Sequence, residues 1–184
     1  MLEYAIFALW FLWPAGFANA TPIFAAVIPG LKKWDAPMDG GRTWRGQPLL
    51  GSHKTWRGLL TGMIMGELIF LLQRGLFVQS EAIRNLCGPV DYTQLPIYFG
   101  ALLGLGALAG DAVESLVKRQ RGIKSGQRWM PFDQLDYIAG ALFISLPFVV
   151  LSLVEYAWIF GLWFGLHLLV SYLGWRTGLK EHPL

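Results

Sequence analysis

Five apolar stretches, each of about 20 residues, constrain what this chain can fold into. They lie at about 4–28, 58–78, 95–117, 137–154 and 156–175. A helix needs that many apolar residues to cross the hydrocarbon core of a bilayer. A soluble domain of 184 residues has no need for such runs along its whole length. We therefore expect an all-α integral membrane protein with five transmembrane helices and one domain, 1–184.

The composition excludes several other classes of protein. Only 15% of the residues are charged, which is too few for a typical soluble domain. Cys87 is the single cysteine, so the chain can form neither an internal disulfide nor a cysteine metal cage. No sequence motif of a hydrolytic triad or a zinc site is present. The start of the chain has no basic segment, which argues against a cleavable signal peptide.

The positions of the basic residues predict how the helices are oriented. Thirteen of the 15 Lys and Arg residues fall in the loop 30–57, in the loop after the third apolar stretch, or in the tail that contains Lys180. Arg74 and Arg84 occupy the loop between the second and third stretches. Basic loops remain in the cytoplasm, so we expect the N-terminus outside and the two basic loops and the C-terminus inside.

Polar and helix-breaking residues interrupt the first apolar stretch. Pro14 and Pro22 predict a kink or a broken helix near Asn19. Unwound backbone at membrane depth is tolerated where it lines a cavity or is buried in protein. Asn19 is therefore a candidate substrate contact, and a helix–helix hydrogen bond is the alternative role for it. By contrast, the glycines of the third stretch permit close packing of helices.

Ionisable residues at the end of the third stretch are costly inside a membrane and therefore indicate function. Asp111 and Glu114 lie in its last turns, and Ser115 and Lys118 follow Asp111 on the same helix face. This pattern predicts one wall of a cytoplasm-facing cavity. The alternative is an Asp–Lys pair that only shields its own charge. Elsewhere in the spans, Glu67 is expected to be neutral or paired and His167 to be packed or hydrogen-bonded.

Two further carboxylates open the fourth stretch. Asp133 and Asp136 are three residues apart and therefore share a helix face. Capping of the helix start is one role for them. Together with Asp111 they form a set that suits Mg²⁺, which binds carboxylates and substrate phosphates. We therefore interpret Asp111, Asp133 and Asp136 as candidate metal ligands.

The loop 37–58 has the composition of a phosphate-binding loop. It contains five glycines, two copies of the pattern Thr-Trp-Arg-Gly and several basic or imidazole groups. Backbone amides at glycines can approach an anion closely, and Lys and Arg add charge. Attraction to anionic lipid headgroups, or topology alone, are the alternatives. The basic and imidazole groups are Arg42, Arg45, His53, Lys54 and Arg57.

These motifs resemble the CDP-archaeol synthase family, the archaeal relatives of CDP-diacylglycerol synthase. The resemblance is carried by 19–22, by the loop 37–58, and by 110–124 together with 131–136. Ser125 stands where the diacylglycerol enzymes have an aspartate. The resemblance implies transfer of CMP from CTP to an unsaturated archaeal ether-lipid phosphate, with Mg²⁺, in phospholipid biosynthesis. For that reaction the expected catalytic residues are Asp111, Lys118, Asp133 and Asp136. The residues expected to bind the nucleotide or phosphates are Asn19, His53, Lys54, Thr55, Arg57, Ser115, Arg119 and Lys124.

Other functions remain open at this point. A small transporter or channel would use Asp111, Glu114 and Glu67 to line a path, and a membrane scaffold would bind anionic lipid through the basic loops. An activity like that of CDP-diacylglycerol synthase on another lipid phosphate is a further alternative. No nucleic-acid partner is expected. The oligomeric state stays open, with a homodimer among the alternatives.

Overall fold

The computed structural model describes residues 1–124 and 127–177, so Ser125 and Lys180 lie outside the described residues. The described residues are mostly helical, as expected. The helices are α1 (Leu2–Ala25), α2 (Pro29–Lys32), α3 (Trp56–Gln79), α4 (Glu81–Leu86), α5 (Phe99–Gln120), α6 (Phe132–Ser145) and α7 (Leu153–Arg176). Two short antiparallel strands, β1 (Thr43–Trp44) and β2 (Gln47–Pro48), form a hairpin in which Thr43 pairs with Pro48.

Four of the helices, α1, α3, α5 and α7, are long and apolar enough to cross a membrane. The fourth expected span corresponds to α6, which has 14 residues and ends at Ser145 instead of continuing to Val154. Pro147 follows closely, and a proline cannot extend the helix. The chain then runs without helix to Ser152, whose side chain and that of Glu155 form the capping box that starts α7. A total of five spans stays a prediction.

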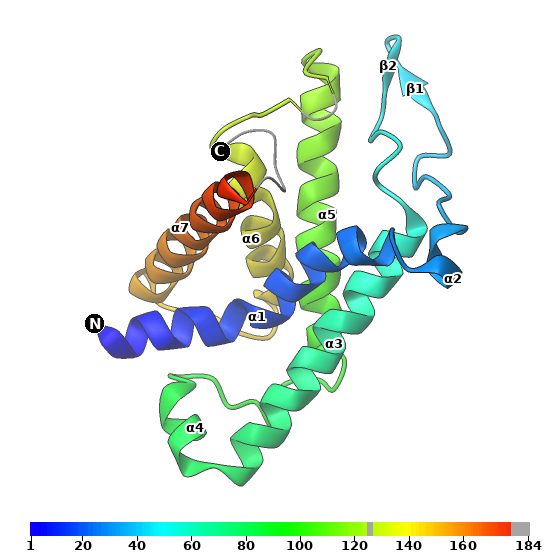
Figure 1. Cartoon of the computed structure of the whole chain (residues 1–184). Helices are drawn as coiled ribbons and strands as arrows, with labels where there is room; N and C mark the ends of the chain where they lie inside the picture. Colours follow the sequence, from blue (N-terminus) through cyan, green and yellow to red (C-terminus); the bar gives the residue numbers. More distant parts are fainter. Residues whose placement is uncertain (125–126, 178–184) are drawn as a thin grey trace.

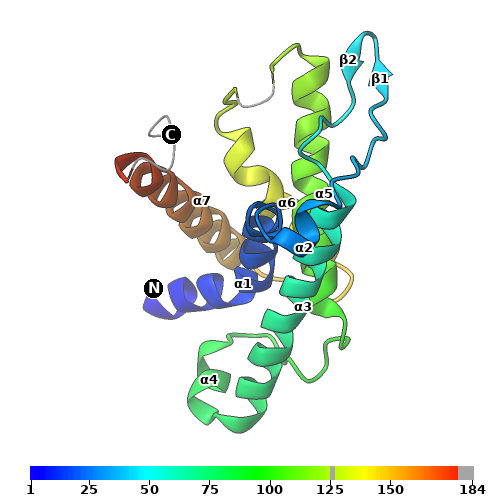
Figure 2. The ribbon, with the colours of Figure 1, turned by 45° about the vertical axis from the view of Figure 1, so that its right-hand side comes forward.

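The helices pack around α5, which contacts α1, α3 and α6. On the other side of the molecule, α7 packs against α1 and α6. Figure 1 shows α4 at one end of the molecule, and the β1–β2 hairpin beside the end of α5 at the opposite end. Figure 2 shows the same separation after rotation. The two basic loops therefore emerge at one end, and Arg84 on α4 lies at the other.

The first helix is continuous through both of its prolines. Of the two outcomes expected near Asn19, a kink or a broken helix, the break is not observed, and Figure 1 shows that α1 changes direction part-way along its length. Pro14 has no N–H group for the carbonyl of Trp10, four residues earlier. The side chain of Gln73 on α3 donates to that carbonyl oxygen at 2.6 Å. A neighbouring helix thus satisfies the backbone group that the proline frees.

Glycines bring α5 and α6 into backbone contact. A Cβ atom on Gly140 would lie 2.1 Å from the carbonyl oxygen of Gly106, and one on Gly110 would lie 2.2 Å from that of Asp136. No side chain fits at such distances, so the close approach depends on glycine. The expectation that the glycines of α5 permit tight packing is confirmed. This contact sets the distance between the acidic residues of the two helices.

Polar side chains accept hydrogen bonds from backbone amides in the first turns of α3 and α5. Oγ1 of Thr55 accepts a hydrogen bond from the amide of Gly58 at 3.1 Å, which caps the start of α3. Oε2 of Glu67 accepts from the amide of Ala101 at 2.9 Å, in the first turn of α5. Glu67 is thus engaged by the backbone of a neighbouring helix, in agreement with the expected paired carboxyl.

Candidate active site

A cavity of about 970 Å³ opens between the ends of α1, α3, α5, α6 and α7 and the loop before α3. Among the residues expected at the site, seven line this cavity: Asn19, His53, Lys54, Thr55, Arg57, Asp111 and Asp133. They come from four helices and one loop, and they are widely separated in the sequence. The cavity is large enough to take a ligand of nucleotide size.

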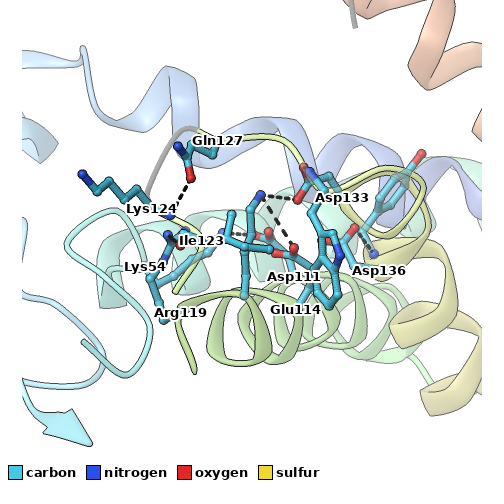
Figure 3. A network of polar contacts seen from close by, with 12 residues as sticks. Lys54, Asp111, Glu114, Arg119, Ile123, Lys124, Gln127, Asp133 and Asp136 are labelled. Atoms are coloured by element: carbon cyan, nitrogen blue, oxygen red, sulfur yellow. Dashed lines mark hydrogen bonds and ion pairs between the residues drawn. The ribbon is translucent and has the colours of Figure 1, made fainter. Parts of the chain in front are cut away.

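Three carboxylates gather beside this cavity. Asp111 and Glu114 on α5 and Asp136 on α6 each offer an oxygen, and these atoms lie within 4.8 Å of one another (Figure 3). The close contact of α5 and α6 at Gly110 and Gly140 brings the two helices' acids together. Oε1 of Glu114 is buried and accepts no hydrogen bond among the described residues. Hard divalent cations prefer such oxygen donors, so the group fits Mg²⁺ by its chemistry.

Asp133 takes part in a different contact. Its Oδ1 atom lies 2.5 Å from Nζ of Lys118, and its Oδ2 atom accepts a hydrogen bond from the amide of Trp129 at 2.6 Å. Lys118 is only 6% exposed and also lies 3.7 Å from Oε1 of Glu114. The Lys118 ammonium therefore joins the carboxylate of Asp133 to the acidic group. A role for Asp133 as a metal ligand stays a prediction.

Lys54 brings the loop before α3 to the same place. Its Nζ atom lies 2.5 Å from Oδ2 of Asp111, across 57 positions of the sequence. Both side chains are partly exposed to the cavity, at 22% and 27%. A cation and a carboxylate thus meet where an incoming phosphate would compete with the carboxylate for the cation.

Two of the predicted phosphate ligands also make structural contacts. Arg57 is buried, and its guanidinium donates at 3.3 Å to the carbonyl oxygens of Leu31 and Lys32 at the end of α2. Its Nε atom has no hydrogen-bond partner among the described residues. Thr55 uses its hydroxyl to cap α3. Both residues border the cavity and hold its walls in place.

The other five predicted residues are not among those that line the cavity in the part of the chain that the structure describes: Lys118 and Asp136, which belong to the acidic group and its ion pair, and Ser115, Arg119 and Lys124. Ser115 and Arg119 are buried on α5, and the guanidinium of Arg119 donates to the carbonyl of Ile123. Figure 3 shows the side chain of Lys124 pointing away from the carboxylates, while its amide donates to Oε1 of Gln127 at 2.9 Å. Binding of phosphate by these residues stays a prediction.

The structure also adds residues that the sequence analysis did not place in the site. Glu114 joins the acidic group, and its spacing of three from Asp111 on one helix face was the available signal. His167 on α7 lines the cavity, with its ring centroid 6.1 Å from that of Tyr137. Lys32 and Asp35 line it as well. Nothing local in the sequence indicates that these last three line the same cavity as Asp111.

Comparison with known proteins identifies the family. The family model described as CarS-like, CDP-archaeol synthase, matches residues 1–184. The chain belongs to the CDP-archaeol synthase family. A CDP-archaeol synthase of Thermococcus kodakarensis is 32% identical over 183 residues, which is 99% of this chain and 98% of that protein. One of Methanosphaerula palustris is 38% identical over 154 residues, which is 80% of this chain and 89% of that protein.

A solved structure of an intramembrane enzyme for archaeal membrane lipid biosynthesis has a similar fold. The two chains superpose with a TM-score of 0.70 at 30% sequence identity, and the match covers 89% of this chain and 92% of the solved one. Together with the four long apolar helices, this similarity supports a multi-pass membrane protein. These relatives of the CDP-archaeol synthase family give no support to a transporter or a scaffold.

Proposed function

We propose that this chain, as one membrane-embedded domain over 1–184, transfers CMP from CTP to a lipid phosphate. The lipid is an unsaturated archaeal ether-lipid phosphate, and the products are CDP-archaeol and pyrophosphate. Family membership supports the reaction. The observation that carries the proposal is the group of Asp111, Glu114 and Asp136 beside a cavity bordered by Lys54 and Arg57.

In the reaction one bond forms and one bond breaks. An oxygen of the lipid phosphate bonds to the α-phosphorus of CTP, the bond from that phosphorus to the oxygen bridging the β-phosphate breaks, and pyrophosphate leaves. A phosphate is already ionised at neutral pH, so no activated serine is needed. The task of the protein is to align two anions and to neutralise charge.

Residues of this chain meet those requirements. Lys54 pairs with Asp111, and Lys118 pairs with Asp133 and Glu114, so both ammonium groups would be available to phosphate oxygens at the acidic group. Arg57 and Asn19 border the cavity and would help to orient the nucleotide. When bound, Mg²⁺ would supply charge neutralisation and a template for the phosphates. Asp111, Glu114 and Asp136 would hold the ion, and Asp133, whose carboxylate contacts Lys118, is a further candidate ligand.

We place this site at the cytoplasmic end of the helices. CTP is a cytosolic nucleotide, and the two basic loops lie at the same end of the molecule as the cavity. Basic loops remain in the cytoplasm. If α6 and the residues that follow it also cross the bilayer, the chain has five spans and its N-terminus lies outside. One chain supplies all the residues named, and light scattering of the purified protein would decide whether it forms a homodimer.

The decisive experiment uses purified protein in detergent with labelled CTP and a panel of ether-linked and ester-linked lipid phosphates. We expect a labelled CDP-lipid from the unsaturated ether-lipid phosphate when Mg²⁺ is present. A chelator should abolish the product, and added Mg²⁺ should restore it. If no lipid phosphate yields a CDP-lipid, the proposed function is wrong, and preference for an ester lipid would reassign the substrate.

A further inference from the structure

Asp39 organises the loop that carries Lys54, although it was not among the residues expected at the site. Its Oδ1 atom accepts a hydrogen bond from the amide of Gly41 at 2.9 Å. Its Oδ2 atom accepts from the amides of Leu50 at 2.9 Å and Gly51 at 3.2 Å. One carboxylate thus joins the two ends of the segment that contains the β1–β2 hairpin.

The backbone of Lys54 is connected to this carboxylate from both sides. The amide of Lys54 donates to the carbonyl of Gly51 at 3.2 Å, and Gly51 is itself held by Asp39. The carbonyl of Lys54 accepts from the amide of Met38 at 2.8 Å, and Met38 directly precedes Asp39. The position of the Lys54 backbone therefore depends on the geometry around Asp39.

The loop needs such a contact because of its glycines. Gly41 and Gly51 have φ angles of +74° and +96°, in a region that other residues rarely adopt. Glycine makes these turns possible but also leaves the chain more conformational freedom to lose. Burial alone would raise the pKa of Asp39, but the hydrogen bonds from the amides of Leu50, Gly41 and Gly51 outweigh it and lower the pKa. The carboxylate therefore stays ionised at neutral pH and is a strong acceptor.

Asp39 acts at a distance from the cavity itself. Pro37 and Met38 are among the cavity-lining residues of the described chain, and Asp39 is not. We propose that Asp39 is a positioning residue: its carboxylate fixes the loop so that Lys54 presents its ammonium beside Asp111. This inference rests on the proposed function, because it assigns Lys54 to the phosphates of CTP.

Kinetics of single and double variants test the inference. In Asp39→Asn, one oxygen acceptor is replaced by an NH₂ group that donates, so either the amide of Gly41 or the amides of Leu50 and Gly51 lose their partner. We expect kcat/KM for CTP to fall by about tenfold or more, with a larger change in KM than in kcat. In a Lys54→Met background the same substitution should have little further effect, because residues that act through one another are not additive.

Asp91→Asn is the matched control. Asp91 also accepts hydrogen bonds within a tight turn, from the amide and hydroxyl of Thr93 at 2.8 and 2.6 Å, but in the loop before α5. Its replacement should leave the kinetics for CTP unchanged. An equal fall in Asp91→Asn, or an additive loss when Asp39→Asn is combined with Lys54→Met, would overturn the positioning role.

Hydrogen exchange of the full-length protein gives a readout besides activity. Amides of the segment 36–56 should exchange faster in Asp39→Asn than in the wild type, while those of α5 keep their protection. Unchanged exchange would refute the inference whether or not turnover is measurable. A wild-type protein that forms no CDP-lipid contradicts the proposed function instead, so the two failures are distinguishable.

Discussion

The ammonium of Lys118 on α5 lies 2.5 Å from the carboxylate of Asp133 in the first turn of α6. The two residues are 15 positions apart, one near the end of α5 and the other at the start of α6. Their contact closes one side of the acidic group that α5 and α6 share. The relative position of α5 and α6 therefore depends on an ion pair that also contributes to the charge of the site.

Replacing Lys118 by methionine should therefore damage both stability and activity. The carboxylates of Asp133 and Glu114 would lose their common cation, which costs about 3 kcal/mol where such a pair is buried. We expect kcat to fall by about 100-fold, as when a charge-stabilising group is removed from an active site. Thermal unfolding in detergent and initial rates with labelled CTP measure the two effects. Lys33→Met, at an exposed position after α2, is the control and should change neither.

Substitutions of the acidic residues separate metal binding from ion pairing. Asp136→Asn and Glu114→Gln should weaken the affinity for Mn²⁺ or Mg²⁺ by at least about tenfold, because loss of even an indirect contact has that effect. Asp133→Asn should abolish turnover but keep the metal affinity if the role of Asp133 is to pair with the ammonium of Lys118. Titration of the substrate-free protein, calorimetrically or by Mn²⁺ resonance, measures the affinity. Glu81→Gln at the start of α4 is the control, and equal affinities throughout would remove the metal assignment.

The glycine contact between α5 and α6 predicts a contrast between two alanine substitutions. In Gly140→Ala the new methyl group would lie 2.1 Å from the carbonyl oxygen of Gly106, so the helices must separate. We expect a loss of about 1–3 kcal/mol and a fall in activity as Asp111 and Asp136 move apart. Gly161→Ala on α7 has open space around its Cβ position and should be neutral or stabilising. Melting temperatures of the two variants in one detergent provide the comparison.

A double-mutant cycle tests the contact between Gln73 and the carbonyl of Trp10. Gln73→Leu leaves that buried carbonyl without its partner and should cost about 1–2 kcal/mol. Pro14→Ala supplies a backbone N–H that reaches the same carbonyl. Gln73→Leu should therefore cost less in the Pro14→Ala background than in the wild type, by unfolding measured in micelles. Additive losses would mean that the hydrogen bond contributes no stability.

The apolar runs predicted four of the long helices, because α1, α3, α5 and α7 match them within a few residues. The capping box of Ser152 and Glu155, which starts α7, was not part of that prediction. The end of α6 was misjudged because the apolar run continues to Val154. Hydropathy reports burial in lipid, whereas Pro147 was the local signal that the helix stops.

The sequence indicated which residues belong to the candidate site, but not which of them lie close to one another. Asp111 and Asp136 were named from their positions at helix ends, yet their proximity depends on the backbone contact at Gly110 and Gly140. No spacing rule shows which glycine faces which helix. Glu114 was visible three positions from Asp111 on the same face, whereas His167 enters the cavity only through the crossing of α7 with its neighbours.

The proline inside α1 also has a consequence for biogenesis. A lone α1 in lipid would leave the carbonyl of Trp10 without a hydrogen-bond donor, and the side-chain amide of Gln73 on α3 supplies one in the folded protein. We therefore expect the first helix to reach its low-energy state once α3 has entered the bilayer beside it. Insertion of α1 and α3 as a pair should then be more favourable than insertion of α1 alone.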